Sequence, residues 1–125
     1  MPVPNFIILY VDSPADSAAF YAKLLQRQPV ESSPTFAMFV FDGGHRLGLW
    51  SRHTVTPAAT AAAGTVELVF SEKTDAAVDA KHAEWKAAGL PILQAPADAE
   101  FGRTFTAADP DGHRLRVYHV SEEPR

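Results

Sequence analysis

The sequence has 125 residues, of which 46% are hydrophobic and 21% charged, with a formal net charge of -4 and no cysteine. This length and composition are typical of one folded domain and exclude extensive disorder. The acidic balance, with Lys and Arg scattered, argues against a nucleic-acid-binding protein. The lack of cysteine excludes disulfides and a cysteine nucleophile and suits a reducing compartment. With no evident signal peptide or membrane-spanning stretch, we expect a cytoplasmic protein that binds neither nucleic acid nor membrane.

The first half of the chain predicts a strand, a helix and a hairpin. Residues 5–11 (NFIILYV) form a nearly continuous apolar run, which is typical of a buried strand. Ser13 is a good helix N-cap, and Pro14 suits the first helical position. The patterns that follow predict a helix to about Leu25, a strand at 35–41, a turn at 42–44 (DGG) and a strand at 45–50.

The same order of elements then repeats after an Ala-, Thr- and Pro-rich linker at residues 53–64. Trp85 falls on the buried stripe of the second helix and is predicted to lie in the core. The predicted elements are a strand at 65–70, a helix at 75–88, strands at 91–94, 104–108 and 113–120, and a turn at 109–112 (DPDG). We therefore expect a single domain, residues 1–125, with a first module at about 1–52 and a second at about 65–125. The predicted fold class is α+β.

Motifs in both halves carry a resemblance to a known family. Tyr10-Val11-Asp12 is followed by Phe20-Tyr21 in the first half, and Phe-Gly-Arg at 101–103 by DPDGH at 109–113 in the second. Together they resemble the vicinal oxygen chelate superfamily, also called the glyoxalase/bleomycin resistance/dioxygenase superfamily, over nearly the whole chain. The resemblance implies two βαβββ modules that form curled mixed sheets around a pocket. It also implies a homodimer.

A narrower likeness is to the phenazine antibiotic resistance proteins of that superfamily. It rests on FGRTF at 101–105, DPDGHRLRV at 109–117 and LWS at 49–51. Mitomycin-binding resistance proteins look similar around residues 42–44 and 46–47. Such proteins sequester a drug rather than destroy it. The resemblance therefore implies metal-independent binding of a planar aromatic small molecule, of the phenazine or another antibiotic type, and drug resistance by sequestration.

Metal-dependent members of the superfamily hold a divalent ion with about four His, Glu or Gln side chains. The resemblance places those positions at about Asn5, Gly48, Val66 and Arg116, and none of these is a competent metal ligand. Glu67 lies one residue from an expected position, but one ligand cannot make a site. We therefore predict no metal, no cofactor and no catalytic residue.

Alternation along the strands selects the residues expected to line the pocket. If Gly48 faces the pocket, Trp50 shares its side, and the space beside Gly48 would let a flat ring stack on the indole. Arg116 could pair with a carboxylate on that ring system, or instead with an acidic partner such as Glu100. The predicted ligand-binding residues are Ile7, Leu9, Phe36, Met38, Arg46, Gly48, Trp50, Phe101, Arg116 and Tyr118.

Two other functions remain open, although the residues favour a binding protein over an enzyme. A glyoxalase-like lyase, isomerase or dioxygenase with an atypical metal site would need at least three convergent ligands. An interaction module would use only the dimer surface and would need no pocket. Trp50 could likewise belong to the core or to a dimer interface.

Overall fold

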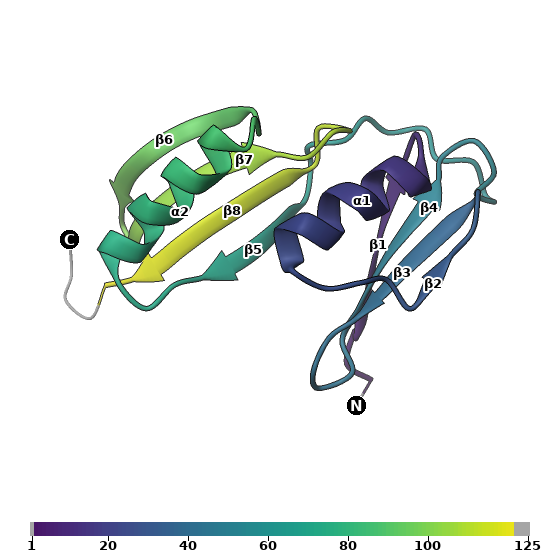
Figure 1. Cartoon of the computed structure of the whole chain (residues 1–125), viewed down its shortest axis with the longest axis horizontal. Coiled ribbons are helices and arrows are strands. Elements are labelled where there is room, and N and C mark those ends of the chain that lie inside the picture. The colour runs from purple at the N-terminus through teal and green to yellow at the C-terminus, as the bar shows by residue number, and fades with distance from the viewer. Residues whose placement is uncertain (1, 122–125) are drawn as a thin grey trace. The chain divides into compact units, whose positions relative to one another are not determined.

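The computed structural model describes residues 2–121, and the chain divides into two compact units between Ala61 and Ala62. Each unit consists of one helix packed against one face of a four-stranded mixed sheet (Figure 1). This is the α+β architecture of paired βαβββ modules that the sequence predicts. The division falls inside the predicted linker. Its first part packs with the first unit, because Val55 is buried and donates its N–H to the Ser51 carbonyl at 3.1 Å.

The first unit contains five elements, with strand order β1-β4-β3-β2. β1 runs parallel to β4, and the other neighbours are antiparallel. The elements are β1 (Phe6–Val11), α1 (Pro14–Leu25), β2 (Glu31–Ser32), β3 (Phe36–Val40) and β4 (Arg46–Ser51). Only β2 lacks a counterpart among the predicted elements, because two exposed polar residues carry no hydrophobic period.

Local chemistry fixes the ends of α1. The Ser13 hydroxyl accepts a hydrogen bond from the Asp16 N–H at 3.2 Å, and Pro14 occupies the first turn, as predicted. The helix ends at Leu25, and its C-cap residue Gln26 adopts the left-handed conformation with φ of 51°. The side chains of Tyr21 in α1 and Leu49 in β4 are both fully buried, in the core between the helix and one face of the sheet.

The second unit repeats this order, with strands arranged β5-β8-β7-β6 and β5 parallel to β8. Its elements are β5 (Glu67–Ser71), α2 (Asp75–Ala87), β6 (Ile92–Ala99), β7 (Gly102–Ala108) and β8 (Arg114–Val120). β6 is longer than predicted. Its register with β7 shifts twice, between Ile92 and Gln94 and between Gln94 and Ala97. An edge strand with such irregularities tolerates Pro96, which in the sequence suggests the end of a strand.

Trp85 lies in the core of the second unit, as predicted from its place on the helix. It is 6% exposed and makes edge-to-face contacts with Phe70 and Phe105, at centroid distances of 5.7 and 5.4 Å. Each such aromatic pair stabilises the folded state by about 0.5–1.5 kcal/mol beyond the contribution of its buried apolar area. The indole therefore anchors α2 to strands β5 and β7.

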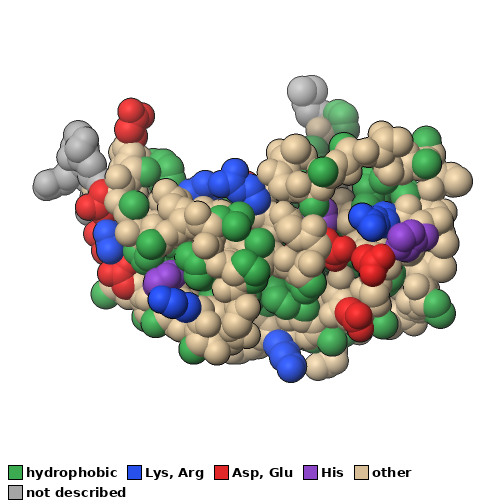
Figure 2. All heavy atoms as spheres, turned by 90° about the horizontal axis from the view of Figure 1, so that it is seen from above, with side chains coloured by type: hydrophobic (Ala, Val, Ile, Leu, Met, Phe, Trp, Pro, Cys, Tyr) green, Lys and Arg blue, Asp and Glu red, His purple; other side chains and the backbone are tan. Residues whose placement is uncertain are grey.

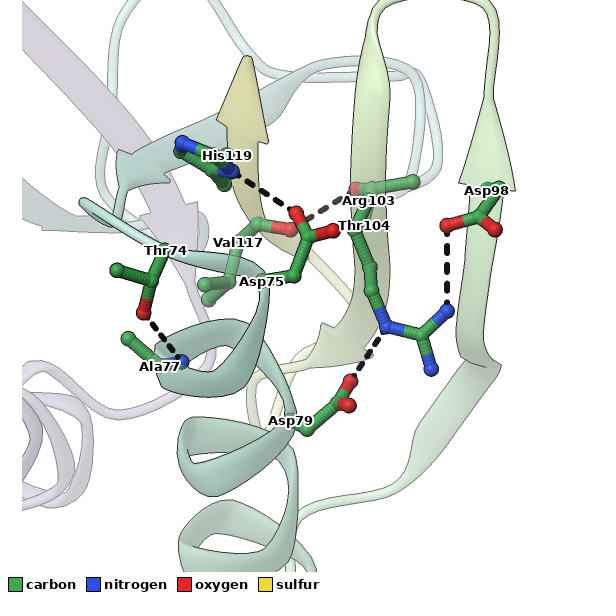
Figure 3. A network of polar contacts seen from close by, with 9 residues as sticks. All are labelled: Thr74, Asp75, Ala77, Asp79, Asp98, Arg103, Thr104, Val117 and His119. Carbon is green, nitrogen blue, oxygen red and sulfur yellow. Dashed lines mark hydrogen bonds and ion pairs between the residues drawn. The ribbon is translucent and has the colours of Figure 1, made fainter. Parts of the chain in front are cut away.

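Ion pairs reinforce the attachment of α2 to its sheet (Figure 3). His119 Nδ1 lies 2.8 Å from a carboxylate oxygen of Asp75. Arg103 bridges Asp79 of α2, at 2.7 Å, and Asp98 of β6, at 3.2 Å. Arg103 and His119 are cross-strand neighbours, so both lie on the face of the sheet that α2 covers. Two ion pairs, His119–Asp75 and Arg103–Asp79, thus join the helix to the sheet, and Asp98 binds the other side of the Arg103 guanidinium.

The opposite face of each sheet carries no helix of its own unit, and we call it the open face. Figure 2 shows Lys and Arg at separate places on the visible surface, among hydrophobic and acidic side chains, rather than as one basic field. Neither helix in the described part of the chain is long and apolar enough to cross a membrane.

Candidate functional site

The open face of the first sheet is predominantly aromatic and apolar. The strand register shows which side chains share it, because directly paired residues of neighbouring strands point to the same side. Leu47 and Leu49 are buried on the helix side, so the alternate residues of β4 point away from the helix. The open face then comprises Phe6, Ile8, Tyr10, Glu31, Phe36, Met38, Val40, Arg46, Gly48 and Trp50.

This register corrects the predicted contribution of β1. Ile7 and Leu9 pair with Leu47 and Leu49 and therefore lie on the helix side, where Leu9 is 7% exposed. The side chains that face outward are Phe6, Ile8 and Tyr10, none of which is among the predicted ligand-binding residues. The error has a physical cause: a continuous apolar run shows no alternation, so its phase cannot be read locally.

Gly48 does not leave an open gap, contrary to the prediction. A Cβ atom at this position would lie 2.9 Å from Cε1 of Phe6 and 3.0 Å from Cζ of Phe36. The two phenyl rings therefore close over the glycine. Phe36 also meets Trp50 edge-to-face, with centroids 6.0 Å apart and planes at 85°. We call Phe6, Phe36 and Trp50, gathered around Gly48, the aromatic face.

The aromatic face remains accessible within its own unit. Trp50, Phe36 and Phe6 are partly exposed. Ile8 and Tyr10 beside them are 40% and 44% exposed. The Arg46 guanidinium lies 5.9 Å from the centroid of the Phe6 ring, within the range of a cation–π contact. Such a surface suits a flat apolar molecule, because aromatic rings associate with centroids about 4.5–7 Å apart.

The open face of the second sheet carries a polar network centred on Arg116. Its Nε and Nη2 donate to the two carboxylate oxygens of Glu67, at 2.7 and 2.9 Å. Its Nη1 donates to Gln94 Oε1 at 3.3 Å and to Thr104 Oγ1 at 3.2 Å. The Arg116 guanidinium, which has five N–H bonds, thus makes four hydrogen bonds within the chain.

The partner of Arg116 therefore differs from both predicted ones. Its acidic partner within the chain is Glu67, 49 residues away, and not Glu100. Because Glu67 already occupies the bidentate edge of the guanidinium, Arg116 is not available to clamp a ligand carboxylate in the same way. The hydrogen bond from Arg116 lowers the pKa of the Glu67 carboxyl, and Glu67 raises the pKa of Arg116.

The two remaining predicted residues also lie in the second unit. Phe101, in the β6–β7 turn, is 44% exposed and meets Tyr118 at a centroid distance of 6.0 Å. Tyr118 pairs with Thr104 and Ser71 and shares the open face with Arg116. The structure thus gathers Phe36, Met38, Arg46, Gly48 and Trp50 on one open face, and Arg116 and Tyr118 on the other, with Phe101 against Tyr118.

The donor set does not fit a metal centre of the kind that the superfamily implies. Val66 precedes β5 and is 66% exposed, and Glu67 is the neighbouring residue that shares a face with Arg116. Both oxygens of Glu67 accept hydrogen bonds from a fixed cation, which disfavours metal coordination. Among residues 2–121, no three His, Asp or Glu side chains gather in a way that could hold a metal ion.

The sequence as a whole matches one known protein family. The chain matches the family model of the glyoxalase/bleomycin resistance protein/dioxygenase superfamily over residues 4–117, and it belongs to that superfamily. The superfamily membership and the paired-module fold, predicted from the motifs in both halves of the chain, are therefore confirmed.

Three members or structural neighbours of this superfamily are similar to the chain over most of its length. The chain is 29% identical over 117 residues to the phenazine antibiotic resistance protein EhpR of Enterobacter agglomerans, covering 91% of this chain and 89% of EhpR. It is 58% identical to protein ATC0852 of Agrobacterium tumefaciens, whose solution structure matches with a TM-score of 0.89 over 97% of this chain and 99% of that one. A glyoxalase/bleomycin resistance protein/dioxygenase of Nocardioides, 22% identical, shares the fold with a TM-score of 0.83 over 100% of this chain and 87% of its own.

The Glu67–Arg116 pair predicts a dependence of stability on pH. Because the pKa of Glu67 is lowered in the folded state, its contribution is present above the ordinary value of 4.5 and is lost as the pH falls through the folded value. Glu67→Gln should reduce the free energy of unfolding at pH 7 by about 1–2 kcal/mol, since it leaves two arginines without a carboxylate. The difference from the wild type should shrink below about pH 4.5. Urea unfolding between pH 3 and 7 measures both effects.

Glu31→Gln, at an exposed position of β2, is the matched control and should change stability little at any pH. Equal stability of Glu67→Gln and the wild type at pH 7 would contradict the assigned role of the pair.

Proposed function

We propose that this protein binds a planar aromatic small molecule on the aromatic face of its first sheet, without a metal ion. The observation that carries the proposal is the cluster of Phe6, Phe36 and Trp50 around Gly48, on a face that α1 leaves uncovered. Leaving such rings facing water is unfavourable. A flat apolar ligand would remove this surface from water and add ring–ring contacts.

The relationship to EhpR supports a phenazine-type ligand, because the relative is a phenazine antibiotic resistance protein and a phenazine is a flat fused-ring system. We propose that the chain confers resistance by sequestering such a compound in the cytoplasm. Sequestration requires only binding. It therefore suits a face built from rings and aliphatic side chains better than conversion of the ligand does.

The competing proposal, a lyase or dioxygenase with an atypical metal site, has less support. Such an enzyme needs at least three protein ligands around one ion. On the described part of the second sheet's open face, the strand positions provide one carboxylate, Glu67, and Arg116 engages both of its oxygens. We therefore favour binding over catalysis.

We further propose that the protein acts as a homodimer. Ile8 and Tyr10 on one open face and Val69 on the other are between 40% and 53% exposed, which is unusual for strand residues of these types. β1 and β5 are also edge strands whose outer hydrogen-bonding sides are unpaired within their own sheets. A second copy of the chain would cover such surfaces through a symmetric interface.

Trp50 gives the direct test of ligand stacking. Phenazine-1-carboxylate should quench the tryptophan fluorescence of the wild type. By isothermal titration calorimetry, Trp50→Ala should bind it about 1–3 kcal/mol more weakly, which is roughly 5- to 150-fold. Trp50→Phe should retain part of the affinity because it keeps a ring. Undiminished binding by Trp50→Ala would rule out stacking on the indole.

Leu93→Ala is the matched control, because Leu93 is 52% exposed on the edge strand β6 of the second unit. It should bind the compound as the wild type does. If Trp50→Ala does not fold, Trp50→Phe decides the question. An unfolded Trp50→Ala together with full affinity in Trp50→Phe would assign the indole to the core.

Metal analysis separates binding from metal-dependent catalysis. We expect purified protein to contain no stoichiometric metal by elemental analysis, because Glu67 is paired and Arg116 repels cations. EDTA should leave the thermal midpoint unchanged, since a bound ion would stabilise the folded state that holds it. About one Zn, Ni, Fe or Mn per chain would support the enzyme instead.

Sedimentation velocity tests the homodimer. At micromolar concentration we expect a species of twice the chain mass of 13.6 kDa. The apolar open faces and the unpaired strand edges provide the physical reason. A species of 13.6 kDa across this concentration range would contradict the proposal.

A further inference from the structure

The open face of the second sheet carries more positive than negative charge. Glu67 pairs in register with Arg114, and Val69 with Arg116, so the carboxylate and both guanidinium groups lie on the same side of the sheet. Two cations share one anion, and the three groups have a net charge of +1. We call Glu67, Arg114 and Arg116 the charged face.

The single carboxylate is not shared equally. Arg116 donates to both oxygens of Glu67, at 2.7 and 2.9 Å. Arg114 reaches Glu67 with its Nε at 3.6 Å from Oε2, which is an ion pair but too long for a hydrogen bond. The attraction holds Arg114 near Glu67 while leaving its donors unused.

The donors of Arg114 have no other acceptor in the described part of the chain. Its Nε is enclosed by protein and has no hydrogen-bond partner. β8 lies between β5 and β7, and the neighbours of Arg114 across the two strands are Glu67 and Ala108. Glu67 is thus the charged cross-strand neighbour, and Ala108 offers no side-chain acceptor. The Arg114 side chain is nevertheless 39% exposed, so its outer N–H groups can reach a ligand.

A partly exposed guanidinium with unused N–H groups is suited to a carboxylate, which it binds through two parallel hydrogen bonds. The surroundings add a second requirement. Val69, next on the same face of β5 after Glu67, is 53% exposed. An anion with an apolar body could pair with Arg114 and also cover this side chain.

We propose that Arg114, and not Arg116, is an anion-binding residue of the second unit, and that it takes the carboxylate of an apolar small-molecule acid. Arg116 keeps Glu67 occupied, so Glu67 does not satisfy Arg114. This site is additional to the aromatic face and does not depend on it, because all the residues that define it belong to strands of the second sheet.

Side-chain NMR provides the test. The Nε–Hε resonances of ¹⁵N-labelled wild-type protein are followed during titration with benzoate, acetate, inorganic phosphate and the neutral analogue benzamide. Benzoate should shift the Arg114 resonance saturably. Acetate and phosphate should bind roughly tenfold or more weakly because they lack an apolar body, and benzamide should leave the resonance in place. The Arg116 resonance should move less than that of Arg114.

Variants identify the residue. Arg114→Gln should weaken benzoate binding roughly tenfold or more, judged from backbone amide shifts, as expected for the loss of charge-assisted hydrogen bonds. Arg114→Lys should retain part of the affinity. Arg52→Gln, which removes an exposed arginine of the first unit, should bind as the wild type does.

Three results would overturn the proposal. The first is a benzoate shift at Arg116 with none at Arg114, and the second is unchanged affinity in Arg114→Gln. The third is phosphate binding as tight as benzoate binding, which would show that the site selects charge and not an apolar acid. If Arg114→Gln does not fold, the wild-type resonances and Arg114→Lys decide the outcome.

Discussion

The register of the parallel strand pair in each unit is the constraint on which both open faces depend. β1 pairs with β4 and β5 with β8, and each pairing fixes which alternate residues face the helix. A slip of one residue would exchange the two sets over the whole strand. In the observed registers, apolar residues are paired on the helix side of each sheet: Leu9 with Leu49 in the first unit and Phe70 with Val117 in the second. These two registers therefore determine which side chains lie on each open face.

Because both units use the same register, their open faces can be compared position by position. Phe6 pairs with Arg46 as Glu67 pairs with Arg114, and Ile8 with Gly48 as Val69 with Arg116. On the antiparallel neighbours β3 and β7, Phe36 corresponds to Thr104 and Met38 to Thr106. On β4 and β8, Trp50 corresponds to Tyr118. One scaffold therefore carries two different chemistries.

The exchange of Gly48 for Arg116 shows how this difference arises. The glycine lets Phe6 and Phe36 close over the sheet, at distances that a Cβ atom would not allow. At the equivalent place in the second sheet, a long cation fills the space and requires acceptors. Glu67, Gln94 and Thr104 provide them. At the places of Glu67 and Thr104 the first sheet has the rings of Phe6 and Phe36, and at the place of Gln94 it has Glu31. This one exchange thus separates a face made mostly of rings and aliphatic side chains from a face centred on a charged network.

Much of the fold could be predicted from the sequence because its signals are local. The Ser13 cap, the core position of Trp85 and the turn after Asp109 each depend on a few neighbouring residues. Asp109 accepts hydrogen bonds from the N–H groups of Asp111 and His113, as expected of a turn former. The outward-facing set of β1 was not predictable, because residues 5–11 are too uniformly apolar to show a phase.

The partner of Arg116 could not be predicted either, for a different reason. Glu67 and Arg116 meet only because β5 and β8 lie side by side, and no local pattern links residues 49 positions apart. The sequence showed that a guanidinium cannot bind a metal, but not which acid it neutralises. The structure adds that this acid is Glu67, the residue closest to an expected ligand position.

This pairing bears on chemistry as well as on stability. For Glu67 to coordinate a metal ion, its carboxylate would have to lose two hydrogen bonds from Arg116 and the ion pair with Arg114. The incoming cation would then lie beside two guanidinium groups without their counterion, which Coulomb repulsion disfavours. An anion meets the opposite situation, because it finds a net positive charge and the unused donors of Arg114. The electrostatics of the same three side chains thus disfavour a metal ion and favour an anion.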